Sequence, residues 1–273
     1  MKLSCLPVSF FPEITSGQMS VAEWARMGAE LGLDAIDLSI LFLPERSLAS
    51  AARLRQQVET EGMRVTMVTT YPDFTHPDRA QRAQELRLEQ EAIAIAAEVG
   101  AELVRVTAGQ AHPETGFQEG VDWAIEGLTH LVETTRSSGI TLAYENHAKP
   151  GAWSYTDFSQ PPEIFLRIVA GTAPCGLKIN FDTGNASAFA ADPVALLRQV
   201  LPWVVSIHAS DSASKGELRH VLLGTGVTPY HNLFKCLKDA GWDGWICMEE
   251  ASYQGRAGVE AAARFVRQTW LEA

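Results

Sequence analysis

The sequence predicts an α/β protein, a single (β/α)8 TIM barrel that occupies residues 1–273. Eight short apolar runs alternate with amphipathic stretches of helical length, and strict alternation of this kind predicts a parallel sheet. Eight repeats close such a sheet into a barrel, and 273 residues suit a fold that typically uses about 250.

The expected strands are short runs rich in β-branched and other apolar residues. In chain order they are LSCLPVSF (3–10), LDAIDLS (33–39), RVTMVTT (64–70), ELVRVTA (102–108), ITLAYEN (140–146), GLKINFD (176–182), VVSIHAS (204–210) and WICMEEA (245–251).

The segments between these runs are rich in Ala, Leu, Glu and Arg, which favours helices. Three of them, residues 21–32, 53–62 and 83–100, end on a glycine suited to a helix C-cap. An open doubly wound sheet is the alternative architecture. It is disfavoured because SFFPEITSG, and no Gly-x-Gly-x-x-Gly turn, follows the first run.

Composition narrows the classes of function. A hydrophobic fraction of 46% supports a large core, and a net charge of −11 argues against a nucleic-acid-binding surface. No apolar run reaches the roughly 18 residues of a membrane span, and the first ten residues resemble a strand more than a signal peptide. The four cysteines are far apart in sequence, which fits reduced thiols, so we expect a cytoplasmic protein with no membrane or nucleic-acid partner.

Ionisable residues end four successive expected strands: Glu145, Asp182, His208 and Glu249. The carboxyl ends of barrel strands meet at one rim, where carboxylates repel one another unless a cation lies between them. Three carboxylates and one imidazole suit Mn²⁺, Mg²⁺ or Co²⁺ better than a thiolate zinc site. We therefore expect one divalent metal ion, Mn²⁺ first, with Zn²⁺ also compatible.

Glu249 and Glu250 compete for the last ligand position. Adjacent strand residues face opposite sides, so only one of them can point into the barrel mouth. Glu249 is preferred because it directly follows the apolar run WICM.

Five motifs together resemble the xylose isomerase-like TIM barrel superfamily, the sugar phosphate isomerase/epimerase family. They are YENH with Glu145, NFDTGN with Asp182, IHASD with His208, LLGTG at 222–226 and GWICMEE with Glu249. The resemblance implies that these four residues hold the metal, that the substrate is a small carbohydrate, and that a homo-oligomer is compatible with the family.

A metal-bound hydroxyketone would have an acidified C–H, and Glu145 and Glu249 could act as general bases on its two faces. Two bases permit epimerisation, whereas one suffices for isomerisation. A metal-dependent lyase that eliminates a β-leaving group from an inosose or a 3-keto-glycoside is the alternative.

The sequence departs from two branches of this superfamily. Its sugar 3-epimerases carry a histidine three residues after the metal aspartate, whereas this chain has Asn185. Its apurinic endonucleases need that histidine and an aspartate two residues before the later histidine, where this chain has Leu218 ahead of His220. The nuclease is thus the least favoured alternative.

Further polar residues are candidate substrate contacts, each with a structural alternative. His147 shares a strand face with Glu145, so we expect it to contact the substrate, to assist acid/base catalysis or to form a structural hydrogen bond. Asn185 can bind a substrate oxygen. Asp211 could bind substrate, orient His208 or cap a loop. Arg219 and His220, in the loop after the seventh strand, could bind substrate hydroxyls or lie in solvent.

Loops at the same rim could also contribute residues to the pocket. The long insertion 147–163 could cover the site as a lid. His76 and His112 follow the third and fourth strands and are substrate contacts or surface residues. The aromatic residues expected to wall the pocket are Phe10, Phe11, Phe42, Tyr71 and Trp153.

Overall fold

The computed structural model describes residues 1–149 and 151–273. Its eight strands form one parallel sheet: β1 (Lys2–Leu6), β2 (Ile36–Ser39), β3 (Val65–Thr69), β4 (Leu103–Val106), β5 (Thr141–Glu145), β6 (Lys178–Asp182), β7 (Val204–Ala209) and β8 (Trp245–Glu249). Neighbouring strands pair in the order β1-β8-β7-β6-β5-β4-β3-β2, and β1 also lies against β2, which closes the barrel. The predicted fold class is confirmed.

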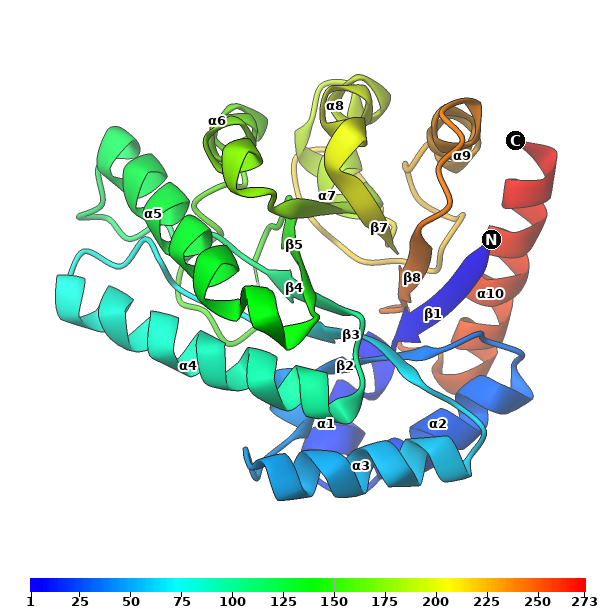
Figure 1. Cartoon of the computed structure of the whole chain (residues 1–273). Helices are drawn as coiled ribbons and strands as arrows, with labels where there is room; N and C mark the ends of the chain where they lie inside the picture. Colours follow the sequence, from blue (N-terminus) through cyan, green and yellow to red (C-terminus); the bar gives the residue numbers. More distant parts are fainter. Residues whose placement is uncertain (150) are drawn as a thin grey trace.

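Helices surround the strands (Figure 1). They are α1 (Phe11–Thr15), α2 (Val21–Glu30), α3 (Leu48–Thr60), α4 (Arg79–Val99), α5 (Phe117–Thr135), α6 (Pro162–Thr172), α7 (Thr183–Phe189), α8 (Pro193–Val200), α9 (Tyr230–Asp239) and α10 (Gly255–Glu272). The long helices contact their neighbours in chain order around the barrel. Within the described residues, no helix is both long and apolar enough to cross a lipid bilayer.

Several element boundaries differ from the sequence-based expectation, and two of them have a clear local cause. The first strand was expected to reach Phe10, but it ends at Leu6, because Pro7 has no N–H for the ladder and a 3-10 turn (Val8–Phe10) follows. Helix α4 begins at Arg79, four residues before the expected start, because the Asp78 side chain accepts the Ala80 N–H as an N-cap. It ends where expected, at Gly100, which takes the left-handed conformation with φ 90°.

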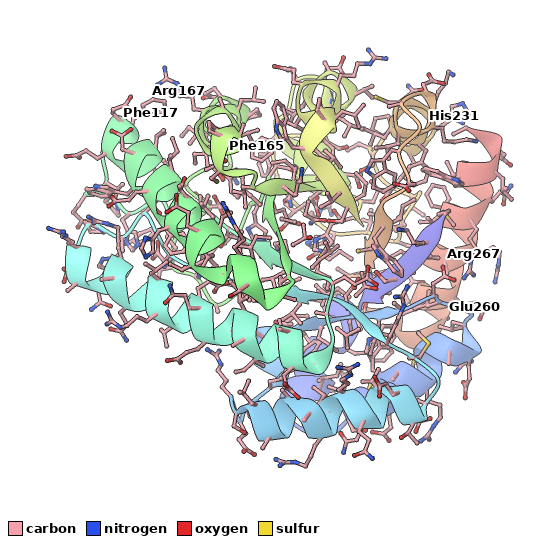
Figure 2. All side chains as sticks on the ribbon, in the orientation of Figure 1. Phe117, Phe165, Arg167, His231, Glu260 and Arg267 are labelled. Carbon is pink, nitrogen blue, oxygen red and sulfur yellow. The ribbon has the colours of Figure 1, made fainter. Side chains whose placement is uncertain are left out.

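The core has two parts. A large apolar cluster fills the space between the barrel and the helices, and Phe165 of α6 lies in it, while Arg167 of the same helix projects into solvent (Figure 2). A separate small cluster contains Ala35, Met67, Leu103, Trp245 and Cys247. Along β8, Trp245 and Cys247 belong to the small cluster, whereas Ile246 and Met248 belong to the large one. The small cluster therefore lies inside the barrel, and strand alternation directs Glu249 to that same interior side.

The segment between β5 and α6 packs along the loop that follows β4. Asp157 forms an isolated antiparallel bridge with Gln110, and the Phe158 N–H donates to the Gly109 carbonyl at 2.8 Å. The expected lid includes this segment. Pro150, which belongs to that expected lid, lies outside the described residues.

Candidate metal centre and substrate cavity

A cavity of about 420 Å³ opens at the carboxyl ends of the strands. Its lining includes Leu6 at the end of β1, Arg105 of β4 and Glu249 at the end of β8, together with residues of the loops that follow the strands. This is the rim where active sites of (β/α)8 barrels lie.

Three of the four expected ligands meet at this rim. Glu145 and Asp182 end β5 and β6, and His208 is the second-last residue of β7, where strand pairing sets it beside Asp182. One ligand-type atom from each lies within 4.8 Å of the others, and all three side chains are buried. Glu249 approaches from β8: its Oε1 lies 4.0 Å from His208 Nδ1. Residues up to 104 positions apart in the chain thus converge (249 − 145).

Glu145 is held by side chains from two neighbouring strands. Arg105 Nε forms an ion pair with Glu145 Oε2 at 3.2 Å, and Asn180 Nδ2 donates to Oε1 at 2.7 Å. Burial alone would raise the pKa of Glu145, but Arg105 and then His208 outweigh it and lower the pKa to about 2. Glu145 is therefore a carboxylate at neutral pH, as a metal ligand must be.

The sequence did not lead us to expect Arg105 or Asn180 in the site, although a local feature of the sequence points to each of them. Arg105 is a charged residue flanked by valines in an apolar run, and its Nη1 donates to the Thr70 carbonyl at 2.9 Å. Asn180 stands two positions before Asp182, so strand alternation puts both on one face. Its Oδ1 accepts from Ser206 Oγ at 2.7 Å, which fixes the amide that contacts Glu145.

In the described part of the chain, the hydrogen bonds to the Asp182 carboxylate come from neutral donors. Ser210 Oγ donates to its Oδ1 and Oδ2 at 2.8 and 3.0 Å, and the Asn185 N–H donates to Oδ1 at 2.6 Å, so Asp182 also caps α7. Burial, and after it the charges of Glu249 and Glu145, raise its pKa well above the ordinary value. A cation at this point would relieve that repulsion.

His208 completes the centre. Its Nδ1 lies 2.6 Å from Glu145 Oε1 without hydrogen-bond alignment, and neither ring nitrogen has a hydrogen-bond partner among residues 1–149 and 151–273. Burial opposes a charge on this ring, but the carboxylates of Glu145 and Glu249 outweigh burial and raise its pKa to about 9. The two ring nitrogens of His208 and Oε2 of Glu145 are buried without a hydrogen-bond partner among the described residues, and together with the nearby carboxylate of Asp182 they fit a divalent cation as the missing partner.

A second histidine borders the centre. His147 Nε2 lies 3.9 Å from Glu145 Oε2, and its Nδ1 lies 3.8 Å from Asp157 Oδ2, with no hydrogen bond to Nδ1 or to Oδ2. Burial lowers the pKa of His147 to about 3 and raises that of Asp157 to about 8. Asp157 is fixed by Ser159, whose N–H and Oγ both donate to Oδ1 at 2.7 Å. Because Asp157 lies in a loop, no periodic pattern in the sequence identified it as a site residue.

The remaining expected substrate contacts separate into two groups. Asn185 and His220 line the cavity, and each has a buried polar atom, Oδ1 and Nδ1 respectively, without a hydrogen-bond partner. Asp211 instead accepts the N–H groups of Gly224, Gly226 and Thr228 at 2.9, 2.9 and 3.0 Å, the arrangement of the loop-capping alternative.

Arg219 also follows its structural alternative: its side chain is 68% exposed, pairs with Glu217 at 3.5 Å and is not among the residues that line the cavity.

Glu250, His76 and His112 lie away from the cavity lining. Glu250 Oε1 accepts the Ser252 N–H at 2.8 Å, on the outer side of β8. His112 Nε2 lies 2.8 Å from Asp73 Oδ2, and its ring packs against that of His76 with 4.6 Å between centroids.

Of the expected aromatic walls, Phe11 and Tyr71 line the cavity, whereas Phe10, Phe42 and Trp153 do not.

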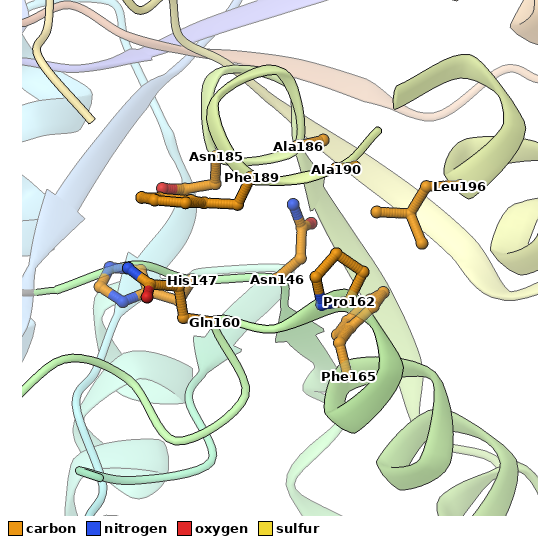
Figure 3. Close-up of a pocket in the computed structure, with 10 residues that line it drawn as sticks. All are labelled: Asn146, His147, Gln160, Pro162, Phe165, Asn185, Ala186, Phe189, Ala190 and Leu196. Atoms are coloured by element: carbon orange, nitrogen blue, oxygen red, sulfur yellow. The ribbon is translucent and has the colours of Figure 1, made fainter. Parts of the chain in front are cut away.

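A narrow crevice of about 10 Å³ adjoins the cavity beneath His147 and Asn185. Figure 3 shows these two residues on one side of the crevice and Phe165 and Leu196 on the other. It has room for about one water molecule, so of these two adjoining spaces the larger cavity is the one that can hold a substrate.

Comparison with known proteins agrees with this architecture. The family described as xylose isomerase-like TIM barrel matches residues 25–269. L-ribulose-5-phosphate 3-epimerase UlaE of Shigella boydii is 24% identical over 285 residues, which cover 98% of this chain and 94% of UlaE.

Two solved structures share the fold. The zinc-bound IOLI protein has a TM-score of 0.80 at 16% identity, with 100% of this chain and 99% of that chain covered. The probable 3-DHS dehydratase AsbF of Bacillus anthracis has a TM-score of 0.76 at 18% identity, with 98% and 99% covered. Enzymes are thus among the relatives, by name a sugar epimerase and a probable dehydratase. Because the family match extends over most of the sequence, this chain belongs to the xylose isomerase-like TIM barrel family.

Proposed function

We propose that this protein is a divalent-metal-dependent isomerase or epimerase of a sugar or related hydroxyketone. The observation that carries the proposal is the convergence of Glu145, Asp182 and His208, with Glu249 beside them, at a cavity of about 420 Å³. The name of the relative UlaE, a sugar phosphate 3-epimerase, supports the reaction class, and the zinc of the IOLI structure supports a divalent ion.

Glu145, Asp182, His208 and Glu249 would hold the ion, with Mn²⁺ preferred because three of the four ligands are carboxylates. Such an ion polarises a carbonyl and stabilises the negative charge that develops when the neighbouring C–H is lost.

The two glutamates would move the proton. Glu145 and Glu249 come from β5 and β8, with two strands between them, so they approach the cavity from different directions. One removes the proton from the carbon beside the carbonyl. In an epimerisation the other returns a proton to the opposite face of that carbon. In an isomerisation a proton is returned to the former carbonyl carbon, while the hydroxyl proton of the first carbon moves to the former carbonyl oxygen. Asn185, His147 and His220, which line the cavity, would bind the substrate oxygens.

Two measurements test this proposal. Metal analysis of the purified protein should find about one divalent ion per chain, which Asp182→Ala and His208→Ala should remove. Incubation of candidate hydroxyketones in deuterium oxide should introduce deuterium at the carbon beside the carbonyl. Glu145→Gln and Glu249→Gln should slow this exchange by at least about a hundredfold. Exchange at the wild-type rate in either variant would exclude that glutamate as a base.

A lyase is the second candidate, favoured by His147 and Asp157. These two groups, 3.8 Å apart and buried next to Glu145, could donate a proton to a leaving group after the first proton is abstracted. Release of water or an aglycone during turnover, without return of deuterium to the substrate, would select this reaction over epimerisation.

A further inference from the structure

The cavity has two chemically different sides. The side formed by the loops after β5 and β7 and by α7, which follows β6, presents His147, Asn185 and His220. The opposite arc, formed at the ends of the neighbouring strands β8, β1 and β2 and by the segments that follow them, presents an apolar surface apart from the Glu249 carboxylate. Its lining residues are Leu6, Val8, Phe11, Leu41 and Tyr253.

Tyr253 stands out in this arc. It is the one non-glycine residue with positive φ, at 56°, in the described part of the chain, and such a conformation is strained for a residue with a Cβ. The turn is held by the Ser9 Oγ, which accepts the Tyr253 N–H at 2.7 Å. The loop thus maintains a strained backbone that places an aromatic residue, 68% exposed, at the cavity.

Leu41 gives the same surface a second exposed apolar residue. It lies in the 3-10 turn Ile40–Phe42 after β2 and is 41% exposed. Its neighbour Phe42 is buried against Phe11, with 4.6 Å between ring centroids, so the wall behind Leu41 is firmly packed. Leu41 and Tyr253 are therefore apolar groups that a ligand could cover.

Permanent positive charge is scarce in the cavity. Among its described lining residues, only Arg105 and Lys149 carry such a charge. Arg105 is already engaged by Glu145 and by the Thr70 carbonyl, and Lys149, whose Nζ donates to the Ser154 carbonyl at 3.3 Å, belongs to the loop after β5. The apolar arc offers no cation, whereas recognition of a phosphate normally uses arginine or lysine.

We propose that the substrate is a keto-sugar unit whose far end carries an uncharged apolar substituent, such as an alkyl or aryl aglycone, in place of a phosphate. This inference rests on the proposed function, because it sets the sugar against the metal centre and the substituent against Tyr253 and Leu41. A cavity of about 420 Å³ falls within the range that holds ligands larger than one sugar ring. Tyr253 and Leu41 then determine specificity.

Titration calorimetry on the metal-replete protein tests this with two matched pairs of probes. Phenyl β-D-glucopyranoside should bind about tenfold more tightly than methyl β-D-glucopyranoside, because only the phenyl ring reaches the apolar arc. D-fructose 6-phosphate should bind no more tightly than D-fructose.

Variants locate the effect. Tyr253→Ser and Leu41→Ser should each reduce the phenyl preference at least threefold, whereas Tyr253→Phe should retain it. Leu271→Ser, which replaces a residue 81% exposed on α10, is the matched control and should behave as wild type. Tyr253→Gly should lose the preference without a lower thermal midpoint, because glycine tolerates positive φ.

The proposal is overturned if the phenyl glycoside binds no better than the methyl glycoside or does not bind. Tighter binding of the 6-phosphate, or an unchanged preference in both serine variants, also overturns it. These results are distinct from failure of the proposed function, since deuterium exchange into a ketose is measured without any aglycone. Exchange without a phenyl preference refutes only the specificity, whereas a preference without exchange or elimination refutes the reaction.

Discussion

Removal of the Arg105 side-chain charge should destabilise the barrel strongly. Arg105 and Glu145 are each only 1% exposed and form an ion pair at 3.2 Å. Arg105→Met keeps most of the apolar stem but leaves Glu145 as a buried carboxylate without its cation and the Thr70 carbonyl without its donor. Breaking a buried pair in this way costs about 3–5 kcal/mol of unfolding free energy. For a domain of this size, that loss lowers the thermal midpoint by on the order of 10 °C.

The loss should depend on pH. In the wild type, the lowered pKa of Glu145, about 2, gives stability that is present above its ordinary value and is lost as the pH falls toward 2. Without Arg105 the pKa of Glu145 rises, so the native variant takes up a proton at a higher pH than the wild type does. The difference in unfolding free energy between the two proteins should therefore shrink as the pH falls.

Chemical denaturation with chelator present, at about pH 7.5 and about pH 4, measures both effects. Arg64→Met is the matched control, because Arg64 pairs with Glu102 at 2.6 Å with side chains 56% and 45% exposed. A hydrated pair of this kind contributes little, so this variant should differ far less from wild type. A loss below about 1 kcal/mol in Arg105→Met, or a loss that grows toward acid pH, would refute the reasoning.

Three further outcomes are expected. Mn²⁺ at a hundredfold excess over its Kd should stabilise chelator-treated protein by about 2.7 kcal/mol, which calorimetry would detect as a higher thermal midpoint. Asp182→Asn should abolish this shift of the midpoint, and a shift retained in that variant would place the ion elsewhere. Burial raises the pKa of Glu89 to about 7, so the contribution of Glu89 to unfolding free energy should fall by on the order of 3 kcal/mol from about pH 4.5 to 7. Glu89→Gln should change the pH dependence of unfolding free energy by that amount relative to wild type, and an identical pH dependence in the two proteins would contradict the assignment. Gly120→Ala should lower the unfolding free energy by about 1–3 kcal/mol, measured by chemical denaturation, because the added Cβ would overlap the Phe158 ring. A neutral effect would mean that the loop that carries Phe158 shifts freely.

The sequence by itself determined the barrel and the residues at its rim. Alternation of strand and helix is a local pattern, and it sufficed for eight strands because each run buries its side chains independently of the others. The same logic identified Glu145, Asp182, His208 and Glu249, since the carboxyl ends of parallel strands meet at one edge. Element ends were less certain: Pro7, which lacks an N–H, shortened the first strand relative to the expectation.

Only the tertiary structure decided which partners the rim residues take. The pairing of Arg105 with Glu145 depends on the register between β4 and β5, and that of His147 with Asp157 depends on the path of a long loop. The loop after β7 likewise directs three amides at Asp211 and leaves Arg219 in solvent. The residues in these contacts are separated along the chain by distances that follow neither the helical nor the strand period. No local pattern of side chains could therefore predict the contacts.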